Sequence, residues 1–478
     1  MTSIESEPGT GSLPILALAA AAFSIAQTAI LPGIGVLTHA LDASAADVSW
    51  VMSGYLLAAA VLTPILGRLG DMYGKRRMLL IVLVLFAAGS VVAALAPNVW
   101  VLVAARVLQG AGGGIIPLCL GIVSDAFPPQ RRPVALGVVA AIAGIGAGAG
   151  LLMGGLLLDH ASWHWIFWSG AAMAGVAALG ALRLPADTGG APGRLDLVGV
   201  ALLTVGLVAP LFALTRTATW GWGDPRTVGL IVGGLAVLVV FVLVERRITD
   251  PLVDMRVLGR PVVLTTNITT LLFGFGMFGA FLLIPQLAQT PERFGYGFGL
   301  SATGAGLLLL PACVAMLVAG GLAGRVATRV GPKIPLVTGA VVAAAGLAAL
   351  AVAHGSQGAV IAWSVLLFGG IGFGMAAMPN LIMEAVPHEM IGQGNGVNNL
   401  IRSVGSSLGS QIVATLLAGS VIATRPVPSG TAYTQAFWIA AAGIAVAAVA
   451  ALLIPRRGET PTAVDGRPLA AARAGTPD

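Results

Sequence analysis

The chain has 478 residues, of which 57% are apolar and only 9% are charged. A soluble chain carries about 25% charged residues, so these charges are too few to build a water-facing surface at this length. Together with a mean hydropathy of +0.95, the composition excludes an ordinary soluble enzyme and predicts an integral membrane protein.

The positive charge does not indicate a nucleic-acid partner. The formal net charge is +6, but nucleic-acid binding requires basic residues gathered in a patch, and here they lie in the gaps between long apolar runs. Cys119 and Cys313 lie far apart inside such runs, which favours two small core residues over a disulfide framework or a zinc site. Glu5 and Glu7 stand where a signal peptide would carry basic residues, so we expect the first apolar run to be a retained span.

The apolar runs predict the number of membrane spans. A helix needs roughly 20 mostly apolar residues to cross about 30 Å of hydrocarbon, and runs such as LLIVLVLFAAGSVVAALA lack the alternation of a membrane β-strand. The predicted fold class is therefore an all-α integral membrane protein with fourteen transmembrane helices. They lie near 13–37, 48–69, 78–96, 99–124, 133–158, 164–184, 195–215, 226–245, 262–289, 300–326, 334–353, 357–385, 393–422 and 432–454.

The basic residues predict the orientation of these spans. Lys and Arg accumulate in short cytoplasmic loops, and an even number of spans places both termini on one side. One set of alternate loops, together with the C-terminal tail, contains nineteen of the 25 basic residues, whereas the other set contains four. Arg106 and Arg402 lie inside spans. Both termini are therefore expected in the cytoplasm.

An internal repeat relates the two ends of the chain. Gly67 and Gly74 in the second-to-third loop correspond to Gly324 and Gly331, and both pairs are displaced by 257 residues. Gly137 and Gly394 have the same displacement. Six spans explain only part of this offset, so two extra helices lie between the repeats. The predicted order is a cytoplasmic tail (1–12), a six-helix half (13–185), a two-helix insertion (186–260), a second six-helix half (261–455) and a disordered cytoplasmic tail (456–478).

The loop from Gly67 to Arg77, GRLGDMYGKRR, carries the first motif. Its glycines permit a tight reversal that a Cβ would hinder, and its cations suit a cytoplasmic surface. Simple charge anchoring explains the basic residues, but it does not explain Asp71, an acid in a strongly basic loop. This acid is a candidate functional group.

The fourth run carries the second motif, with Leu102, Arg106, Gln109 and a glycine cluster from Gly110. An arginine in mid-helix costs about 2.5 to 3.5 kcal/mol on the insertion scale, so it must face the protein interior or water. Gln109 lies about one turn further along the same face and could share its hydrogen bonds. The alternative is a purely structural arginine bonded to backbone carbonyls.

The fifth run carries the third motif, a stripe of glycines. Gly146, Gly150 and Gly154 follow one another at intervals of four residues and therefore share one helix face. A stripe of small residues lets a neighbouring backbone approach closely. We expect this face to pack tightly against another span.

With these motifs at these places, the chain resembles the major facilitator superfamily, and specifically its bacterial fourteen-span drug:proton antiporters. The resemblance covers about residues 13–455. It implies two pseudo-symmetric halves that rock against each other around a substrate site near the bilayer midplane.

The resemblance also implies roles for the motif residues. Asp71 would be a latch between the halves, pairing with arginine and with a helix N-terminus, where negative charge is favoured. The proton-coupling and switching set would be Gly67, Asp71, Gly74, Arg76, Arg106 and Gln109. The antiporter helix would carry Gly137, Gly146, Gly150, Gly154 and Gly155, although the family pattern has a proline where this chain has Leu151.

The distribution of acidic residues bears on the substrate. None of the 19 acids lies in the middle of a predicted span, and the first span lacks the carboxylate that many relatives have there. We therefore hypothesise an amphipathic substrate that is neutral or anionic rather than dicationic. Phe273, Phe275, Met277 and Phe278 would supply either apolar contact to it or a plain packing face. The polar candidates for the cavity are Gln27, Thr28, Tyr55, Asn267, Thr270, Gln286, Asn380 and Asn399.

The predicted function is secondary active export of drug-like or antibiotic-like molecules across the plasma membrane, driven by the proton gradient. A metabolite importer or facilitator of the same fold remains the alternative. The five histidines are scattered without metal-ligand spacing, so we expect neither an enzyme nor a bound metal or organic cofactor. The proton is the expected coupling ion, and the chain is expected to act as a monomer in the bilayer.

Overall fold

The computed structural model describes residues 11–43, 45–128, 132–185, 196–248, 251–253, 255–386, 391–421 and 427–454. Within these ranges every regular element is a helix, and there is no strand. The predicted tails lie almost wholly outside the described residues.

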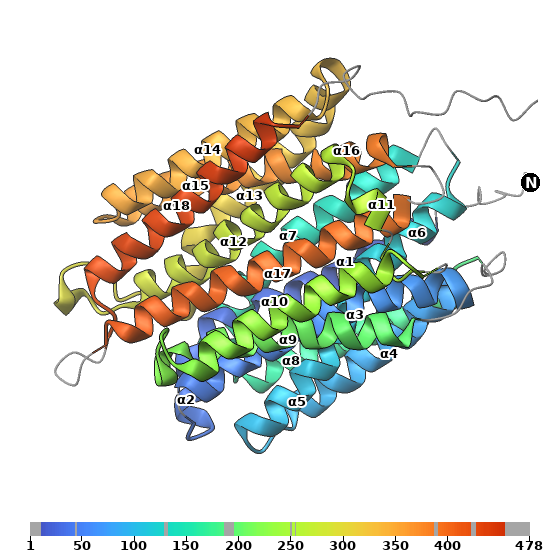
Figure 1. Ribbon diagram of the computed structural model, residues 1–478. Helices are drawn as coiled ribbons and strands as arrows, with labels where there is room; N and C mark the ends of the chain where they lie inside the picture. The colour runs from blue at the N-terminus through green and yellow to red at the C-terminus, as the bar shows by residue number, and fades with distance from the viewer. Residues whose placement is uncertain are drawn as a thin grey trace, which may run out of the picture.

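The helices run side by side as one elongated bundle (Figure 1). In chain order they are α1 (Ser12–Thr28), η1 (Leu31–Gly33), α2 (Ile34–Ala40), α3 (Ala45–Tyr73), α4 (Lys75–Ala94), α5 (Val99–Gln109), η2 (Gly110–Gly114), α6 (Ile115–Ala126), α7 (Arg132–His160), α8 (His164–Ala181), α9 (Leu197–Trp220), α10 (Pro225–Glu245), α11 (Met255–Leu258), α12 (Pro261–Gln289), η3 (Glu292–Phe294), α13 (Ala302–Val330), α14 (Lys333–Val352), α15 (Gln357–Met375), α16 (Met378–Ala385), α17 (Ile391–Gly419) and α18 (Gly430–Leu452). We call α1–α8 the N-terminal group, α9 and α10 the central pair, and α12–α18 the C-terminal group.

The outer surface of the bundle is apolar, as a bilayer requires. Leu179, Leu197 and Val352 expose 68, 70 and 75% of their surface, which water would penalise but lipid does not. Helices satisfy their own backbone polar groups, so they can stand in hydrocarbon. Twelve membrane-crossing candidates lie among the described residues, judged by length and apolar character. The helices α7 and α8 are not among these twelve, so the predicted number of fourteen is not reached by this measure.

Three of the predicted continuous spans are broken. The first changes to a short 3₁₀ helix at Leu31–Gly33, where Pro32 cannot donate a backbone hydrogen bond. The fourth passes through a second 3₁₀ segment at Gly110–Gly114, whose glycines have a low helix propensity. The twelfth stops between α15 and α16, just before Pro379. Each break falls inside a run that hydropathy alone treats as uniform.

The helices of the two groups pack in pairs that follow the same chain order. In the N-terminal group α1 packs on α7, α3 on α5 and α4 on α8. In the C-terminal group α12 packs on α17, α13 on α15 and α14 on α18 in the same order. The two groups meet where α7 packs on α13 and α3 on α17, and the central pair joins the bundle through contacts of α9 with α3 and α17.

The repeated loop glycines do not all have the predicted role. Gly74 has φ +99° and Gly331 has φ +83°, in the left-handed region that favours glycine, and each stands at the turn into the next helix. Gly67 and Gly324, in contrast, lie inside α3 and α13, where an added Cβ would meet nothing within 4 Å. The predicted reversal is therefore wrong for the first glycine of each motif, because α3 and α13 continue beyond it.

Candidate functional site

Arg106 is the centre of a buried polar network. It lies near the end of α5, and its exposed surface is 0%. The guanidinium donates from Nε to the carbonyl of Val51 at 3.2 Å, from Nη1 to the carbonyl of Ala26 at 3.3 Å and from Nη1 to Oε1 of Gln109 at 2.8 Å. It therefore connects α1, α3 and α5.

Gln109 extends this network to α4. Its Nε2 donates to Oγ of Ser90 at 2.6 Å, and that hydroxyl donates to the carbonyl of Phe86 at 2.8 Å. Ser90 and Gln109 are both fully buried. A charge held in a dry interior therefore has a continuous chain of neutral partners.

Tyr55 covers one face of the guanidinium. Cζ of Arg106 lies 4.0 Å from the centre of the Tyr55 ring, a cation–π distance. The Tyr55 side chain is fully buried, and its hydroxyl has no hydrogen-bond partner. An unpaired buried hydroxyl is costly, so this hydroxyl is an unsatisfied member of the network.

The hydrogen-bond partners of Arg106 in the described residues are all neutral. Backbone carbonyls, one amide and the sulfur of Met52 receive its donors. Burial of an uncompensated charge costs free energy, and this cost favours any state in which an anion or water reaches the guanidinium. The contacts of Arg106 therefore hold three helices together, and they leave its positive charge able to attract an anion.

The glycine stripe of α7 packs against α1. An added Cβ at Gly150 would lie 2.2 Å from Oγ1 of Thr28, and one at Gly154 would lie 1.9 Å from the carbonyl of Ala29. A Cβ at Gly146 would also clash, at 2.7 Å from Ser24. No side chain can enter at these distances, so the stripe sets the spacing of the two backbones. Gly137 lies nearer the start of α7.

The other face of α7 contacts α13 of the C-terminal group. A Cβ at Gly155 would lie 2.5 Å from the carbonyl of Ala302, at the first turn of α13. Nearby, Oδ2 of Asp159 accepts a hydrogen bond from the backbone N–H of Thr303 at 2.7 Å. The carboxylate therefore caps α13, where negative charge is favoured, and ties the two groups together at this end of the bundle.

A second hydrogen bond joins the groups on the other side of their interface. Nε2 of Gln411 on α17 donates to Oγ of Ser53 on α3. Both side chains are buried. Ser53 lies in the first third of α3, and Asp159 lies at the end of α7, so both ties lie in the half of the bundle opposite to the start of α1, which is on the side marked N in Figure 1.

The family can be read from these features and from the sequence itself. The profile described as the Major Facilitator Superfamily matches residues 16–410. The chain belongs to the major facilitator superfamily. The superfamily consists of transporters, which agrees with the repeated halves, the apolar outer surface and the polar network between helices. The chain is therefore a multi-pass membrane transporter.

Relatives in this superfamily bear names that refer to resistance. The chain is 30% identical over 414 residues to the tetracenomycin C resistance and export protein of Streptomyces glaucescens, covering 85% of this chain and 76% of that protein. It is 34% identical over 385 residues to a puromycin resistance protein of Streptomyces alboniger, covering 78 and 75%. It is 27% identical over 389 residues to a multidrug transporter protein of Bacillus subtilis, covering 80 and 71%. Bacterial homologues are thus named as exporters and resistance proteins.

The loop motif of the superfamily forms a local ion-pair cluster. Nζ of Lys75 lies 3.9 Å from the carboxylate of Asp71 and 2.7 Å from that of Asp125. Arg76 donates to the carbonyl of Leu182 at 2.6 Å, just after α8. These contacts stay within the N-terminal group. The residues just before α17, at 387–390, lie outside the described part, so the latch role of Asp71 between the halves stays a prediction.

The polar residues predicted to line one cavity are distributed over several places. Gln27 and Thr28 lie on α1, Tyr55 lies beside Arg106, and Gln286 and Asn380 are only partly buried. Asn267 and Thr270 on α12 belong to a separate cluster, in which Nδ2 of Asn398 donates to both side chains at 2.8 and 2.7 Å. That all of these residues line one substrate cavity stays a prediction.

Three residues of these networks were missed by the sequence interpretation. Ser90 accepts a hydrogen bond from Gln109. Asn398 donates to Asn267 and to Thr270. Gln411 donates to Ser53 across the interface. Asn399 was predicted instead of Asn398, but its side chain accepts a hydrogen bond from Arg402. Adjacent asparagines on a helix point in directions about 100° apart, so only the packing of α17 on α12 selects one of them.

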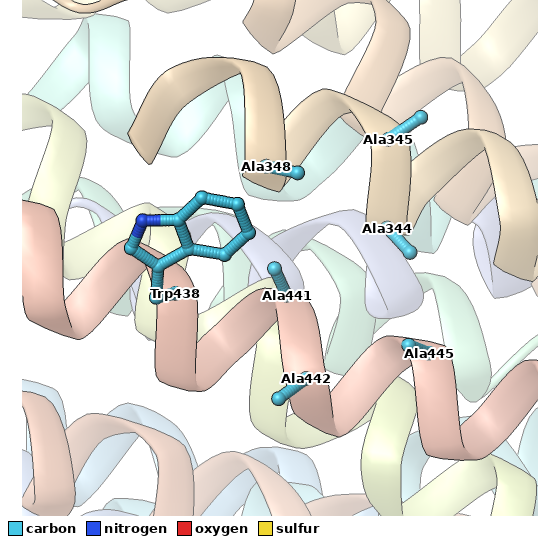
Figure 2. Close-up of a pocket in the computed structure, with 7 residues that line it drawn as sticks. All are labelled: Ala344, Ala345, Ala348, Trp438, Ala441, Ala442 and Ala445. Atoms are coloured by element: carbon cyan, nitrogen blue, oxygen red, sulfur yellow. The ribbon is translucent and has the colours of Figure 1, made fainter. Parts of the chain in front are cut away.

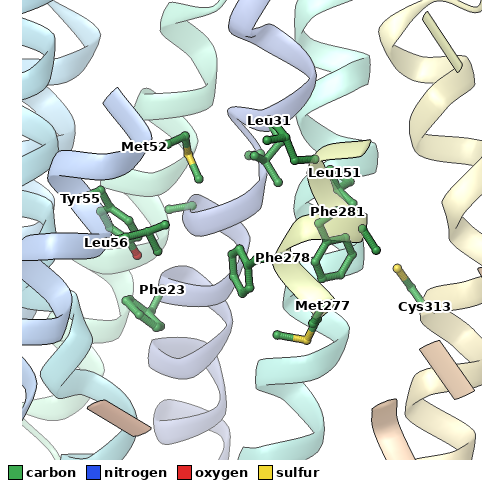
Figure 3. Packing of buried hydrophobic residues seen from close by; sticks show 14 of the residues in the cluster. Phe23, Leu31, Met52, Tyr55, Leu56, Leu151, Met277, Phe278, Phe281 and Cys313 are labelled. Carbon is green, nitrogen blue, oxygen red and sulfur yellow. The ribbon is translucent and has the colours of Figure 1, made fainter. Parts of the chain in front are cut away.

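The centre of the bundle between the networks is apolar. Figure 3 shows Phe23 and Tyr55 on one side and Met277, Phe278 and Phe281 of α12 on the other. Phe273 and Phe275, by contrast, pack toward Gly374 and Gly443 inside the C-terminal group. The aromatic run of α12 therefore has two roles, with Met277 and Phe278 at the centre and Phe273 and Phe275 in helix packing.

An apolar groove lies elsewhere, on the outer side of the C-terminal group. It has a volume of about 370 Å³ between α14 and α18 and is lined by six alanines and Trp438 (Figure 2). Trp438 exposes 48% of its surface. The groove has no charged or hydrogen-bonding group besides the indole N–H, and we assign it to the lipid-facing surface. In the described residues, no group of three or more metal-binding side chains occurs either.

Proposed function

We propose that this transporter exports amphipathic, antibiotic-like molecules across the bacterial plasma membrane by alternating access, driven by the proton gradient. The observation that carries the proposal is the Arg106 network, a buried charge without a counter-ion at the junction of α1, α3 and α5. The names of the relatives from Streptomyces and Bacillus support export as the direction.

We propose fourteen spans arranged as six, two and six. The twelve described candidates leave out α7 and α8, but α7 has 29 residues and packs along both α1 and α13. The helix α8 has 18 residues and packs along α4 and α1. Since helices that pack along spans share their membrane depth, both complete the N-terminal half. The loop charges then place both termini in the cytoplasm.

The conformation is proposed to be closed toward the outside. With both termini in the cytoplasm, the Asp159 cap on α13 lies at the external end and the Gln411–Ser53 bond lies in the external half. Rocking of one half against the other must break both contacts before a substrate can leave. Opening of this end is therefore the step that proton binding would drive.

The substrate is proposed to be neutral or anionic. The centre offers Phe23, Tyr55, Met277, Phe278 and Phe281 as apolar contacts (Figure 3), together with the arginine below the Tyr55 ring. A dication would be repelled by this guanidinium, whereas an aromatic or weakly acidic molecule could pack on the rings. Thioether and aromatic side chains adapt to different shapes.

Uptake into inverted vesicles tests this proposal. An imposed proton gradient is expected to drive accumulation of neutral or acidic polyaromatic antibiotics, and a dicationic dye is expected to accumulate weakly. An uncoupler is expected to abolish the accumulation. Strong transport of dicationic dyes with none of neutral or acidic compounds would overturn the substrate class, and substrate accumulation in right-side-out vesicles would favour the importer instead.

A further inference from the structure

Two carboxyl groups meet at the end of the central pair without a donor between them. Asp196 directly precedes α9, and Glu245 ends α10. An added Cβ at Gly199 would lie 2.2 Å from Oδ2 of Asp196 and 2.4 Å from Oε1 of Glu245. Both oxygens therefore converge on the space that the missing side chain of Gly199 leaves open.

Among the described residues, neither of these two oxygens has a hydrogen-bond partner. Oδ2 of Asp196 and Oε1 of Glu245 are both buried and unpaired, and Glu245 exposes only 2% of its surface. The other oxygen of Glu245, Oε2, accepts a hydrogen bond from the backbone N–H of Val253 at 3.2 Å. Two carboxylate oxygens in a dry site repel each other, and a single shared proton removes this repulsion.

Within the described part of the chain, no basic side chain donates to Oδ2 of Asp196 or to Oε1 of Glu245. Arg246 and Arg247 follow Glu245 and are exposed, and Arg256 on α11 is exposed too. The neighbouring elements carry Arg68 and Asp71 on α3, and Arg402 on α17, whose guanidinium donates to Asn399. Compensation by a bound proton is therefore the simplest way to satisfy the two orphaned acceptors.

We propose that Asp196 and Glu245 form a proton-binding site that holds one proton between Oδ2 and Oε1. The proton enters or leaves from the end of the bundle where α1 begins, and the bond that forms is an O–H···O hydrogen bond between the two carboxyls. No other reactant is needed. The site gives this chain a buried carboxyl for proton handling, although it lies at a span end and not at mid-membrane.

The pair is connected to the interface between the halves. Val253, whose backbone N–H donates to Glu245, and its neighbour Leu252 bury their side chains in an apolar cluster. We call this the strap cluster. It contains residues of α3 and α17, which pack on each other across the interface, residues of the central pair, and three residues that lie between α10 and α12 in the chain. The members are Ala60, Val61, Ile65, Leu203, Leu207, Phe241, Leu252, Val253, Met255, Val397 and Leu400.

Release of the proton is therefore expected to affect the interface. Two ionised carboxylates would separate, and Glu245 would move relative to the Val253 N–H. Because Val253 packs in the strap cluster with Val61 of α3 and Val397 of α17, this movement changes the contact on which rocking depends. This consequence rests on the proposed transport function, but proton binding by the pair does not.

Infrared difference spectroscopy of the full chain in nanodiscs tests the site without transport. The wild type is expected to show the carbonyl stretch of a protonated carboxylic acid at neutral pH. This band should disappear in Glu245→Gln and in Asp196→Asn, and it should persist in the control Glu292→Gln, which removes an exposed acid far from the pair. An unchanged band in both pair variants would overturn the proposal.

A glycine variant separates the pair without removing either acid. Gly199→Ala places a methyl group against both oxygens, so it should push the carboxyls apart and abolish the same band although both acids remain. A bound metal cation is the other way to satisfy the pair. Carboxylate bands that shift with sodium or potassium at constant pH, without any acid band in the wild type, would overturn proton sharing in favour of a cation.

The pH dependence of proton-driven flux tests whether the site is linked to transport. The wild type should change its rate between mildly acidic and mildly alkaline cytoplasmic pH, and Glu245→Gln, whose amide can donate to Asp196, should lose this dependence. Loss of the infrared band together with an unchanged pH profile would retain the proton site and overturn its link to transport. Absence of all transport in the wild type would count against the proposed function alone.

Discussion

At the scale of single residues, the main finding is that buried neutral groups from several helices surround the charge of Arg106. Arg106 uses every nitrogen of its guanidinium, on carbonyls of α1 and α3, on Gln109 and on the sulfur of Met52. The sequence alone predicted that Arg106 and Gln109 share bonds. It could not identify the carbonyls of Ala26 and Val51 as partners, because these depend on how three helices pack.

The geometry of this network predicts the effect of a conservative substitution. Arg106→Lys keeps the charge but loses the planar fork that reaches Val51, Ala26 and Gln109 at once. Hydrogen bonds to charged groups contribute about 1.5–3 kcal/mol each, so we expect proton-driven flux to fall about tenfold or more. Flux in proteoliposomes measures this change.

A control distinguishes this effect from misfolding. Ser169→Ala removes a hydroxyl on α8 that donates only to the carbonyl of Ile166 in its own helix. This variant should transport like the wild type. If Arg106→Lys elutes as a folded protein and also transports at the wild-type rate, the arginine has no part in coupling.

At the scale of elements, close approach of backbones decides which helices pair. Hydrophobic burial does not drive helix association inside lipid, so small residues and close van der Waals contact take its place. The stripe Gly146, Gly150 and Gly154 was predictable from its spacing. The helix that packs against the stripe was not predictable, because the same spacing would fit any span with a smooth face. Only the fold shows that this helix is α1 and that Gly155 faces α13.

This packing predicts a position-dependent cost for an added methyl group. Gly154→Ala places a Cβ 1.9 Å from the carbonyl of Ala29, which forces α1 and α7 apart, and overpacking of this kind costs about 1–3 kcal/mol. Gly175→Ala on α8 is the matched control, because a Cβ there meets nothing within 4 Å. Thermal unfolding in detergent should show a lower midpoint for the first variant only. Equal midpoints would mean that the α1–α7 spacing is not fixed by this glycine.

At the scale of the whole molecule, the two groups are tied together at one end by few polar contacts. The Asp159 cap on α13 is a charge-assisted hydrogen bond between groups. Cys313 lies in the same α7–α13 interface, since a Cβ at Gly148 would lie 2.3 Å from its sulfur. A thiol in such a contact reacts only when the interface opens, so Cys313 is a natural reporter of opening.

We therefore expect Asp159→Ala to expose Cys313. In a Cys119→Ser background, labelling of the remaining thiol by a membrane-permeant maleimide should become about tenfold faster, because loss of a charge-assisted bond of about 1.5–3 kcal/mol shifts the population toward the open state. Mass spectrometry of the labelled chain gives the rate.

Asp224→Ala provides the matched control for this measurement. Asp224 also caps a helix, accepting from the backbone N–H of Arg226 at 2.7 Å, but that helix is α10 and the contact stays within the central pair. Its loss should leave the labelling of Cys313 unchanged. A faster rate in both variants would indicate general loosening and not a contact between the groups.

The sequence by itself determined the membrane class, the helical architecture, most span positions and the pairing of motifs between the two ends of the chain. These follow from composition, hydropathy and spacing, which are properties of the linear sequence. The breaks at Pro32 and at Gly110–Gly114 have local causes in the sequence that hydropathy does not report. Tertiary structure alone decided the choice of Asn398 over Asn399 and the meeting of Asp196 with Glu245. The reason is that a helical period fixes which residues share a face but not which helix that face meets.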